Sequence, residues 1–127
     1  EDRRQRQMCK ETVTIVGSDI LIYRLVYNLV ENAIKYNHPG GQVTVSASRK
    51  EKRVCLSVAD TGNGIPEELR ERVFEPFFRV DKSRSRALGG VGLGLALVHE
   101  IVRVHEGSIT VRSNPSGGTV FEVMFTQ

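Results

Sequence analysis

The fold of this chain is decided by one stretch, SDILIYRLVYNLVENAIKY, which spans residues 18–36. Apolar residues recur within it at the spacing of an α-helix, at positions 21, 22, 25, 26, 29, 30, 33 and 34. Ser18 followed by Asp19 is typical of a helix start, because a serine oxygen accepts from free backbone N–H groups and an acid favours the positive end of the helix. We therefore predict an amphipathic helix over residues 18–36, ended by the turn at 37–41.

The polar face of this helix carries an unusual set of side chains. Asn28, Asn32 and Tyr36 are spaced four residues apart, with Glu31 and Lys35 beside them, so all five share one face. A solvated outer face is the simpler interpretation, although asparagine is a poor helix former. An amide oxygen can also bind Mg²⁺, and a nearby lysine can meet a phosphate. Both interpretations remain open from these residues alone.

Working outward, the rest of the chain alternates between strand and helix patterns. A short helix is expected over residues 66–73 and a second long helix over 92–105, ended by Gly107. Alternation of apolar and polar residues predicts strands at 12–16, 42–48, 54–60, 108–112 and 119–125. Three helices and about five strands predict an α+β fold, a two-layer sandwich in which the helices cover one face of a mixed sheet.

Two glycine-rich segments stand at the ends of predicted elements. Residues 60–65, DTGNGI, form either an ordinary turn or a place where a flat base approaches the backbone beside Asp60. Residues 89–95, GGVGLGL, either hinge the chain or expose N–H groups to an anion at a helix start. No Gly-Lys-Ser/Thr follows this segment, which excludes a P-loop. The dinucleotide-binding fingerprint is also excluded, because a leucine stands where that motif needs its third small residue. Residues 75–92 are irregular, basic and glycine-rich at their end, and they are too long for a simple connection, which predicts a functional loop.

Composition and charge exclude several function classes. The 127 residues, 39% hydrophobic and 26% charged, have room for one globular domain. The net charge of +3 suggests a nucleic-acid binder, but residues 79–86 and the tail 1–10 carry the whole excess, so the charge is local. The longest stretch without charged or amide residues, 87–98, is too short for a membrane span. Cys9 and Cys55 have no CxxC spacing, which disfavours a disulfide framework or zinc site.

Five motifs occur in an order that is more specific than any one of them. They are NLVENAIKY at 28–36, DTGNG at 60–64, FEPFF at 74–78, GVGLGL at 90–95 and GGT at 117–119. This series resembles the catalytic, ATP-binding domain of sensor histidine kinases over almost the whole chain. The resemblance implies a Bergerat-type α/β sandwich with about five strands and three helices. It also implies that residues 1–10 are a linker from an upstream dimerisation domain and that 11–127 form the catalytic domain, with an ATP lid at about 75–91.

The resemblance further implies that the motifs bind ATP and Mg²⁺. Asn28, Asn32 and Lys35 would be catalytic, with Asn32 the Mg²⁺ ligand, Asn28 supporting the metal and phosphates, and Lys35 contacting phosphate. Tyr36 would lie along the adenine and Asp60 would accept its amine. Phe74, Phe77 and Phe78 would anchor the lid. The other expected ATP-binding residues are Gly62, Gly64, Ile65, Phe74, Arg79, Lys82, Gly90, Gly92, Leu93, Gly94, Leu95 and Thr119.

One position separates a kinase from its relatives. Gyrase-type and chaperone ATPases place a glutamate where Asn28 stands, as the base that activates water, and an amide cannot take that proton. The resemblance therefore implies transfer of the γ-phosphoryl group to a histidine on the upstream domain, for relay to a response regulator. His38, His99 and His105 are expected to be structural. The alternative is a non-catalytic nucleotide-sensing module of the same fold.

The context expected for such a domain follows from the same resemblance. The chain begins with Glu1 instead of methionine, which suggests a piece of a longer phosphoprotein in a two-component system. Cysteine usage fits a reducing cytoplasm, and the domain can be the cytoplasmic part of a membrane-bound sensor. The isolated domain is expected to be a monomer that contacts neither nucleic acid nor membrane.

Overall fold

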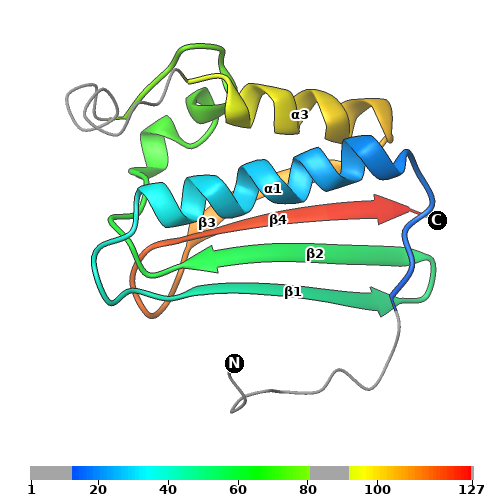
Figure 1. Cartoon of the computed structure of the whole chain (residues 1–127), viewed down its shortest axis with the longest axis horizontal. Coiled ribbons are helices and arrows are strands. Elements are labelled where there is room, and N and C mark those ends of the chain that lie inside the picture. Colours follow the sequence, from blue (N-terminus) through cyan, green and yellow to red (C-terminus); the bar gives the residue numbers. More distant parts are fainter. Residues whose placement is uncertain (1–12, 81–91, 127) are drawn as a thin grey trace.

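Two helices lie on one face of a four-stranded sheet in the part of the chain that can be described (Figure 1). The structure is a computed structural model that describes residues 13–80 and 92–126. The helices are α1 (Asp19–Lys35) and α3 (Gly94–Val104), and the strands are β1 (Val43–Lys50), β2 (Arg53–Asp60), β3 (Ser108–Ser113) and β4 (Thr119–Thr126). No helix among the described residues is long and apolar enough to cross a bilayer.

The first helix forms where its sequence predicts it. Ser18 is the N-cap, and its hydroxyl oxygen accepts a hydrogen bond from the Leu21 N–H at 3.2 Å. Its backbone N–H in turn donates to Nε2 of His105, 3.2 Å away, just past the end of α3. The start of α1 is therefore tied to the C-terminal end of α3, which fixes the two helices relative to each other.

The sheet has the order β1-β2-β4-β3, and every neighbouring pair among these strands is antiparallel. The prediction of a mixed sheet is therefore wrong for the described strands. β2 and β3 both run antiparallel to β4, so they are parallel to each other, but β4 lies between them and separates them. The chain after β3 thus turns back into the centre of the sheet, which the strand pattern alone does not reveal.

Two further expectations differ from the structure. Residues 13–16, the described part of the expected strand at 12–16, lie in no strand, because alternation makes a strand only where a partner edge pairs with it. The expected helix at 66–73 consists of two single 3₁₀ turns, η2 (Glu67–Leu69) and η3 (Arg72–Phe74). Such short segments form 3₁₀ turns because nucleating an α-helix is costly. The described residues therefore contain four strands and two α-helices.

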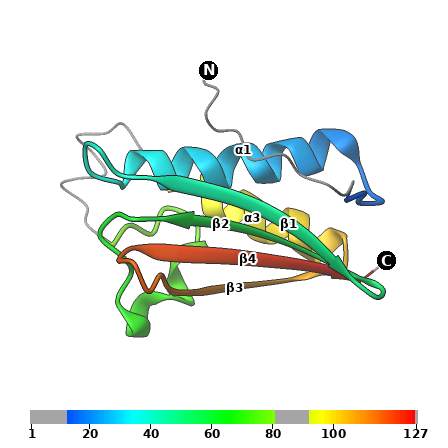
Figure 2. The ribbon, with the colours of Figure 1, turned by 90° about the horizontal axis from the view of Figure 1, so that it is seen from below.

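The core lies between the sheet and both helices (Figure 2). β2 and β4 alternate buried and partly buried residues, so one face of each meets the helices. The largest fully buried side chains are Leu25 and Leu29 from α1, Val98 and Ile101 from α3, and Val54, Val58, Phe121, Val123 and Phe125 from the central strands. The other face of the sheet carries small polar side chains, such as Ser46 and Ser57, whose hydroxyls lie 2.8 Å apart.

Candidate functional site

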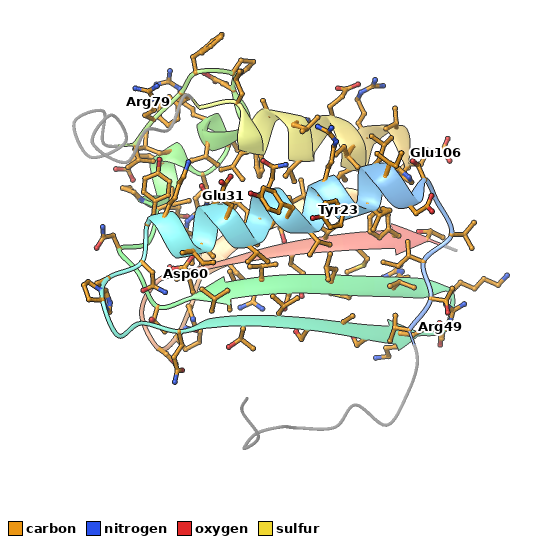
Figure 3. All side chains as sticks on the ribbon, in the orientation of Figure 1. Tyr23, Glu31, Arg49, Asp60, Arg79 and Glu106 are labelled. Carbon is orange, nitrogen blue, oxygen red and sulfur yellow. The ribbon has the colours of Figure 1, made fainter. Side chains whose placement is uncertain are left out.

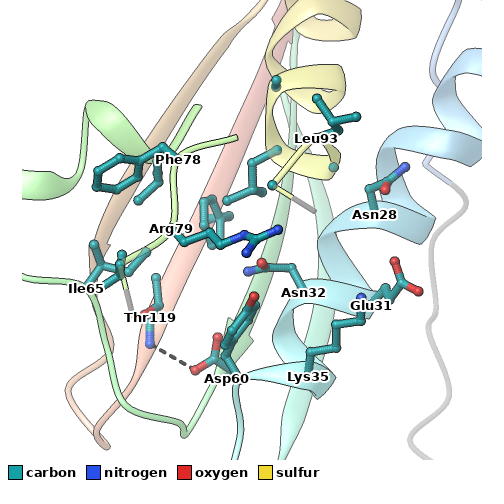
Figure 4. A pocket seen from close by; sticks show the side chains of 18 of the residues that line it. Asn28, Glu31, Asn32, Lys35, Asp60, Ile65, Phe78, Arg79, Leu93 and Thr119 are labelled. Atoms are coloured by element: carbon teal, nitrogen blue, oxygen red, sulfur yellow. Dashed lines mark hydrogen bonds between the residues drawn. The ribbon is translucent and has the colours of Figure 1, made fainter. Parts of the chain in front are cut away.

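A cavity of about 890 Å³ lies at the end of the helix layer, between α1 and α3 and above the sheet (Figure 4). The C-terminal part of α1, the N-terminus of α3, the end of β2 and the start of β4 all meet there. The cavity thus draws its walls from segments that are widely separated in the sequence.

The wall from α1 presents amides and a lysine. Asn28 is oriented by its own helix, because its Nδ2 donates to the Arg24 carbonyl at 2.7 Å. Its Oδ1 then lies against Gly94, where an added Cβ would be 3.0 Å away. Neither Asn32 nor Lys35 makes a side-chain hydrogen bond or ion pair with another described residue, and both line the cavity. Two polar groups are therefore available to a ligand on this wall.

The floor is built around Asp60, which is 6% exposed. Its Oδ1 accepts hydrogen bonds from the backbone N–H groups of Gly62, at 2.8 Å, and Thr119, at 3.3 Å (Figure 4). No described residue donates to Oδ2. Buried polar atoms are normally hydrogen-bonded, so the second oxygen of a carboxylate held this firmly is suited to a ligand that donates.

The turn between β3 and β4 closes the floor from behind. Asn114 donates through Nδ2 to the Asp60 carbonyl at 2.8 Å. Gly118, with φ +100°, leaves no room for a side chain, because a Cβ there would clash with that same carbonyl. Gly118 of the GGT motif is therefore required by a close backbone approach to Asp60.

The third wall is the start of α3. The N-cap position, Leu93, has no side chain that could satisfy the first backbone N–H groups of the helix. Gly92 accepts a hydrogen bond from the Phe77 N–H at 2.8 Å, and its φ of +80° and its contact with the Phe77 backbone exclude a larger residue. Free N–H groups and the helix dipole make this wall suitable for an anion.

Arg79 supplies a second cation. Its guanidinium points into the cavity in Figure 4, and its buried Nε has no hydrogen-bond partner. A buried unpaired guanidinium nitrogen is costly. Because the side chain projects toward the α1 wall, an anion bound in the cavity could supply the missing acceptor.

Most residues expected from the sequence line this cavity. They are Asn28, Asn32, Lys35, Tyr36, Asp60, Gly64, Ile65, Arg79, Gly92, Leu93, Gly94, Leu95 and Thr119. Gly62 does not line it but packs against the Tyr36 carbonyl behind it. Phe74 is also outside the lining, because its ring packs on His99 and Phe121, with centroids 5.3 and 6.2 Å away. Lys82, Gly90 and most of the expected lid, residues 81–91, lie outside the described residues.

Sequence reasoning did not assign several lining residues to the site. They are Glu31, Asn63, Val73, Phe78, Val80, Ala96, Leu97 and Phe121. Six of the eight are apolar, and Phe78 among them was expected only to anchor the lid; an apolar residue that lines a cavity looks the same in a sequence as one that packs in the core. Asn63 lies within the DTGNG motif and Glu31 within the NLVENAIKY motif, so their position beside other expected site residues could have indicated that they line the cavity.

The side-chain atoms that line the cavity also limit which metal ion it could hold. Among the described residues no three His, Cys, Asp or Glu side chains cluster as metal ligands. Asn32 offers an amide oxygen, a hard ligand of the kind Mg²⁺ accepts alongside water and substrate phosphates. The cavity residues therefore fit an ion that is bound mainly through a phosphate ligand.

The fold and this cavity are those of a known class of nucleotide-binding domain. The chain belongs to the family of histidine kinase-, DNA gyrase B- and HSP90-like ATPases, whose model matches residues 17–127. Its relatives within the family are sensor histidine kinases. It is 45% identical over 107 residues to the sensor-like histidine kinase SenX3 of Mycolicibacterium smegmatis and 43% identical to the sensor histidine kinase RppB of Synechocystis.

Solved structures agree with this assignment. The mycobacterial sensor histidine kinase MprB matches 88% of this chain and 76% of its own, with a TM-score of 0.80 and 34% identity. A catalytic domain of the histidine kinase ThkA matches 87% of this chain and 69% of its own, with a TM-score of 0.74 and 31% identity. The match covers 84% of this chain but only 28% of SenX3 and 24% of RppB. The chain therefore corresponds to about a quarter of these longer kinases.

Proposed function

We propose that this chain binds ATP with Mg²⁺ and presents the γ-phosphoryl group to a histidine on a partner domain, which passes it to a response regulator. One observation carries the proposal. A single cavity collects a buried carboxylate with a free oxygen, two amides and two cations, namely Asp60, Asn28, Asn32, Lys35 and Arg79. Full-length ShkA, a structural neighbour that is 32% identical over the matched region, has been solved in complex with AMPPNP, an analogue of ATP.

The floor of the cavity would hold the base. Oδ2 of Asp60 can accept a hydrogen bond from the exocyclic amine of adenine, while Oδ1 stays bonded to the backbone. A guanine would place a carbonyl oxygen against the same carboxylate, and two acceptors facing each other are unfavourable. The site should therefore prefer ATP to GTP.

The opposite side of the cavity would hold the phosphates. The free N–H groups at the start of α3 face the cavity, and Lys35 and Arg79 supply positive charge. Asn32 would hold Mg²⁺ with its amide oxygen, and Asn28 would support the phosphates beside it. When bound, Mg²⁺ supplies neutralisation of the charge on the phosphate oxygens.

The chain contributes to transfer by positioning and charge stabilisation. A nitrogen of the partner's histidine forms a bond to the γ-phosphorus, the bond from that phosphorus to the bridging oxygen breaks, and ADP leaves. Fixing ATP in one geometry accounts for much of such catalysis. Asn28 lies on the α1 wall, and its amide cannot take a proton from water, so hydrolysis would not compete with transfer.

Calorimetric titration of the chain with a non-hydrolysable ATP analogue, with and without Mg²⁺, tests the binding step. We expect one site per chain, tighter binding with Mg²⁺ and weaker binding of the GTP analogue. No binding under any of these conditions would overturn the proposal. Labelled ATP mixed with the chain and a histidine-bearing helical domain from the longer protein should give acid-labile phosphorylation. Binding without transfer to a competent histidine would favour the nucleotide-sensing module instead.

The substitution Asn32→Ala tests the proposed Mg²⁺ site independently of the proposed adenine site. The substitution removes the proposed Mg²⁺ ligand at one end of the cavity and leaves Asp60 intact at the other. We expect phosphorylation of the partner to be lost and the Mg²⁺-dependent part of the binding to disappear, with Mg²⁺-free binding and circular dichroism unchanged. A variant that still transfers phosphate at the original rate would refute the assignment of Asn32.

A further inference from the structure

The side of α1 that faces away from the core is apolar. Ile20, Tyr23, Tyr27 and Ile34 are 53–69% exposed, whereas Leu25 on the opposite side of the helix is fully buried. Figure 3 shows Tyr23 on this outer surface, and none of the other described elements covers it. A contiguous group of large exposed apolar side chains on a soluble domain is typical of an interaction site.

The spacing of these residues identifies the kind of partner. Ile20, Tyr23, Tyr27, Val30 and Ile34 are separated by three, four, three and four residues, which is the heptad spacing of a coiled-coil seam. Val30 is half-buried and completes the row, which we call the α1 seam. The Tyr23 and Tyr27 rings stack along it, with centroids 6.2 Å apart. Val30 also packs against the core, but the four exposed members of the α1 seam do not, so most of the seam is not needed for packing the domain.

Two charged residues beside the α1 seam specify the orientation of a partner. Arg24 and Glu31 are one heptad apart and occupy the same flanking position. Neither forms an ion pair with another described residue. When two copies of α1 lie antiparallel, this position of one helix faces the same position of the other. Arg24 of each copy would then lie near Glu31 of the other, and both pairs form at once because the interface is two-fold.

We propose that two copies of this chain associate through the α1 seam, with their α1 helices antiparallel. Two heptads bury less area than a standard interface, so the association of the isolated domain is weak and fits a monomer in dilute solution. It becomes populated when two copies are tethered at an effective concentration of about 1 mM, as a shared dimerisation domain would provide. No residue of the α1 seam lines the cavity, although Glu31 beside it does, so the seam can be covered without filling the cavity.

Sedimentation equilibrium of the nucleotide-free chain, from about 10 µM to about 1 mM, tests this directly. We expect the weight-average mass to rise with concentration from monomer toward dimer. Tyr27→Glu, Arg24→Glu and Glu31→Arg should each weaken association about tenfold or more, since each removes a contact that occurs twice. The double variant Arg24→Glu/Glu31→Arg should restore it. Val104→Glu, at an exposed apolar position of α3, is the matched control and should change nothing.

Three results would overturn the proposal: a monomer over the whole range, association that Tyr27→Glu leaves unchanged, or no restoration by the charge swap. A fourth would name another occupant: if a chain starting at residue 13 dimerises while the full chain does not, residues 1–12 cover the α1 seam. Circular dichroism checks that each variant folds. Because no nucleotide is present, these outcomes are independent of ATP binding.

Discussion

Among the described residues, Asp60 is the only charged residue that is buried. Burying an acid is costly unless hydrogen bonds hold it, and here two backbone N–H groups hold Oδ1. The ends of β2 and β4 thereby fix the direction of the carboxylate. One residue therefore links the register of the sheet to the floor of the cavity.

Asp60→Asn tests this role with little change of shape. The retained oxygen can keep both backbone hydrogen bonds, but an NH₂ group replaces Oδ2 and cannot accept from adenine. We expect calorimetry to show nucleotide binding weakened by about 1–3 kcal/mol, the usual cost of an unpaired buried polar group. Asp19→Asn, an exposed acid outside the cavity, is the control. Unchanged affinity for Asp60→Asn would mean that the base lies elsewhere.

Cys55 shows how a side chain outside the site is kept unreactive. Burial, together with the hydrogen bond that its Sγ donates to Glu122 Oε2 at 3.2 Å, raises the pKa of the thiol to about 11. The folded chain therefore keeps this proton where the unfolded chain, with a pKa near 9.0, loses it. The stabilisation is complete below pH 9 and is lost as the pH rises to about 11.

Alkylation of Cys55 by iodoacetamide, measured in a Cys9→Ser background, checks this. The thiolate is the reactive form, so we expect little reaction at pH 8.5 and a rise only toward pH 11. Glu122→Gln removes the negative charge that helps to raise the pKa of the thiol, so the increase in alkylation rate should occur at lower pH. Reaction of the parent chain at pH 8.5 as fast as that of free cysteine would contradict the assignment.

At the scale of elements, the turn between β3 and β4 offers a matched pair of glycines. Gly117 and Gly118 have φ values of +95° and +100°, so both disfavour a side chain for the same backbone reason. An added Cβ meets nothing within 4 Å at Gly117, whereas at Gly118 it clashes with the Asp60 backbone. The two positions separate backbone strain from close approach.

Gly117→Ala should lower the free energy of unfolding by about 1 kcal/mol, the cost of a left-handed alanine, and leave nucleotide affinity unchanged. Gly118→Ala should destabilise the domain further and weaken nucleotide binding, because the turn must move away from Asp60. Chemical denaturation and calorimetry measure the two effects. Equal stability and equal affinity of the two variants would show that the close approach at Gly118 is unimportant.

At the scale of the whole molecule, stability comes from one layer of side chains between sheet and helices. Phe125 is fully buried in this layer, whereas Phe77, the same residue type, is 68% exposed near the cavity. We expect Phe125→Ala to lower the free energy of unfolding by about 3–5 kcal/mol. Phe77→Ala should change it by less than about 0.5 kcal/mol. Urea denaturation checks both, and similar losses for the two would place the core elsewhere.

Much of the architecture could be predicted from local patterns. Ser18 and the 3.6-residue period of α1 predict that helix, because its cap and its apolar face are both local properties. The four described strands were expected within about two residues of their ends, because alternation reflects one buried face. The segments at 13–16 and 66–74 were predicted less well. Their structure depends on a partner edge or on packing against other elements.

The features of the cavity were likewise only partly predictable from the sequence. Local sequence predicts most of the polar lining, since Asn28, Asn32, Asp60 and several glycines stand in short motifs whose order is informative. Thirteen of the seventeen residues expected to bind ATP line the cavity. Three features depend on contacts between distant segments: β4 lies between β2 and β3, the backbone N–H of Thr119 holds Asp60 in place, and Phe74 stays outside the cavity. The tertiary structure also left four of the five residues of the α1 seam exposed. The physical reason is that a pattern records which side chains avoid water, whereas contacts between distant segments are settled only when the whole layer packs.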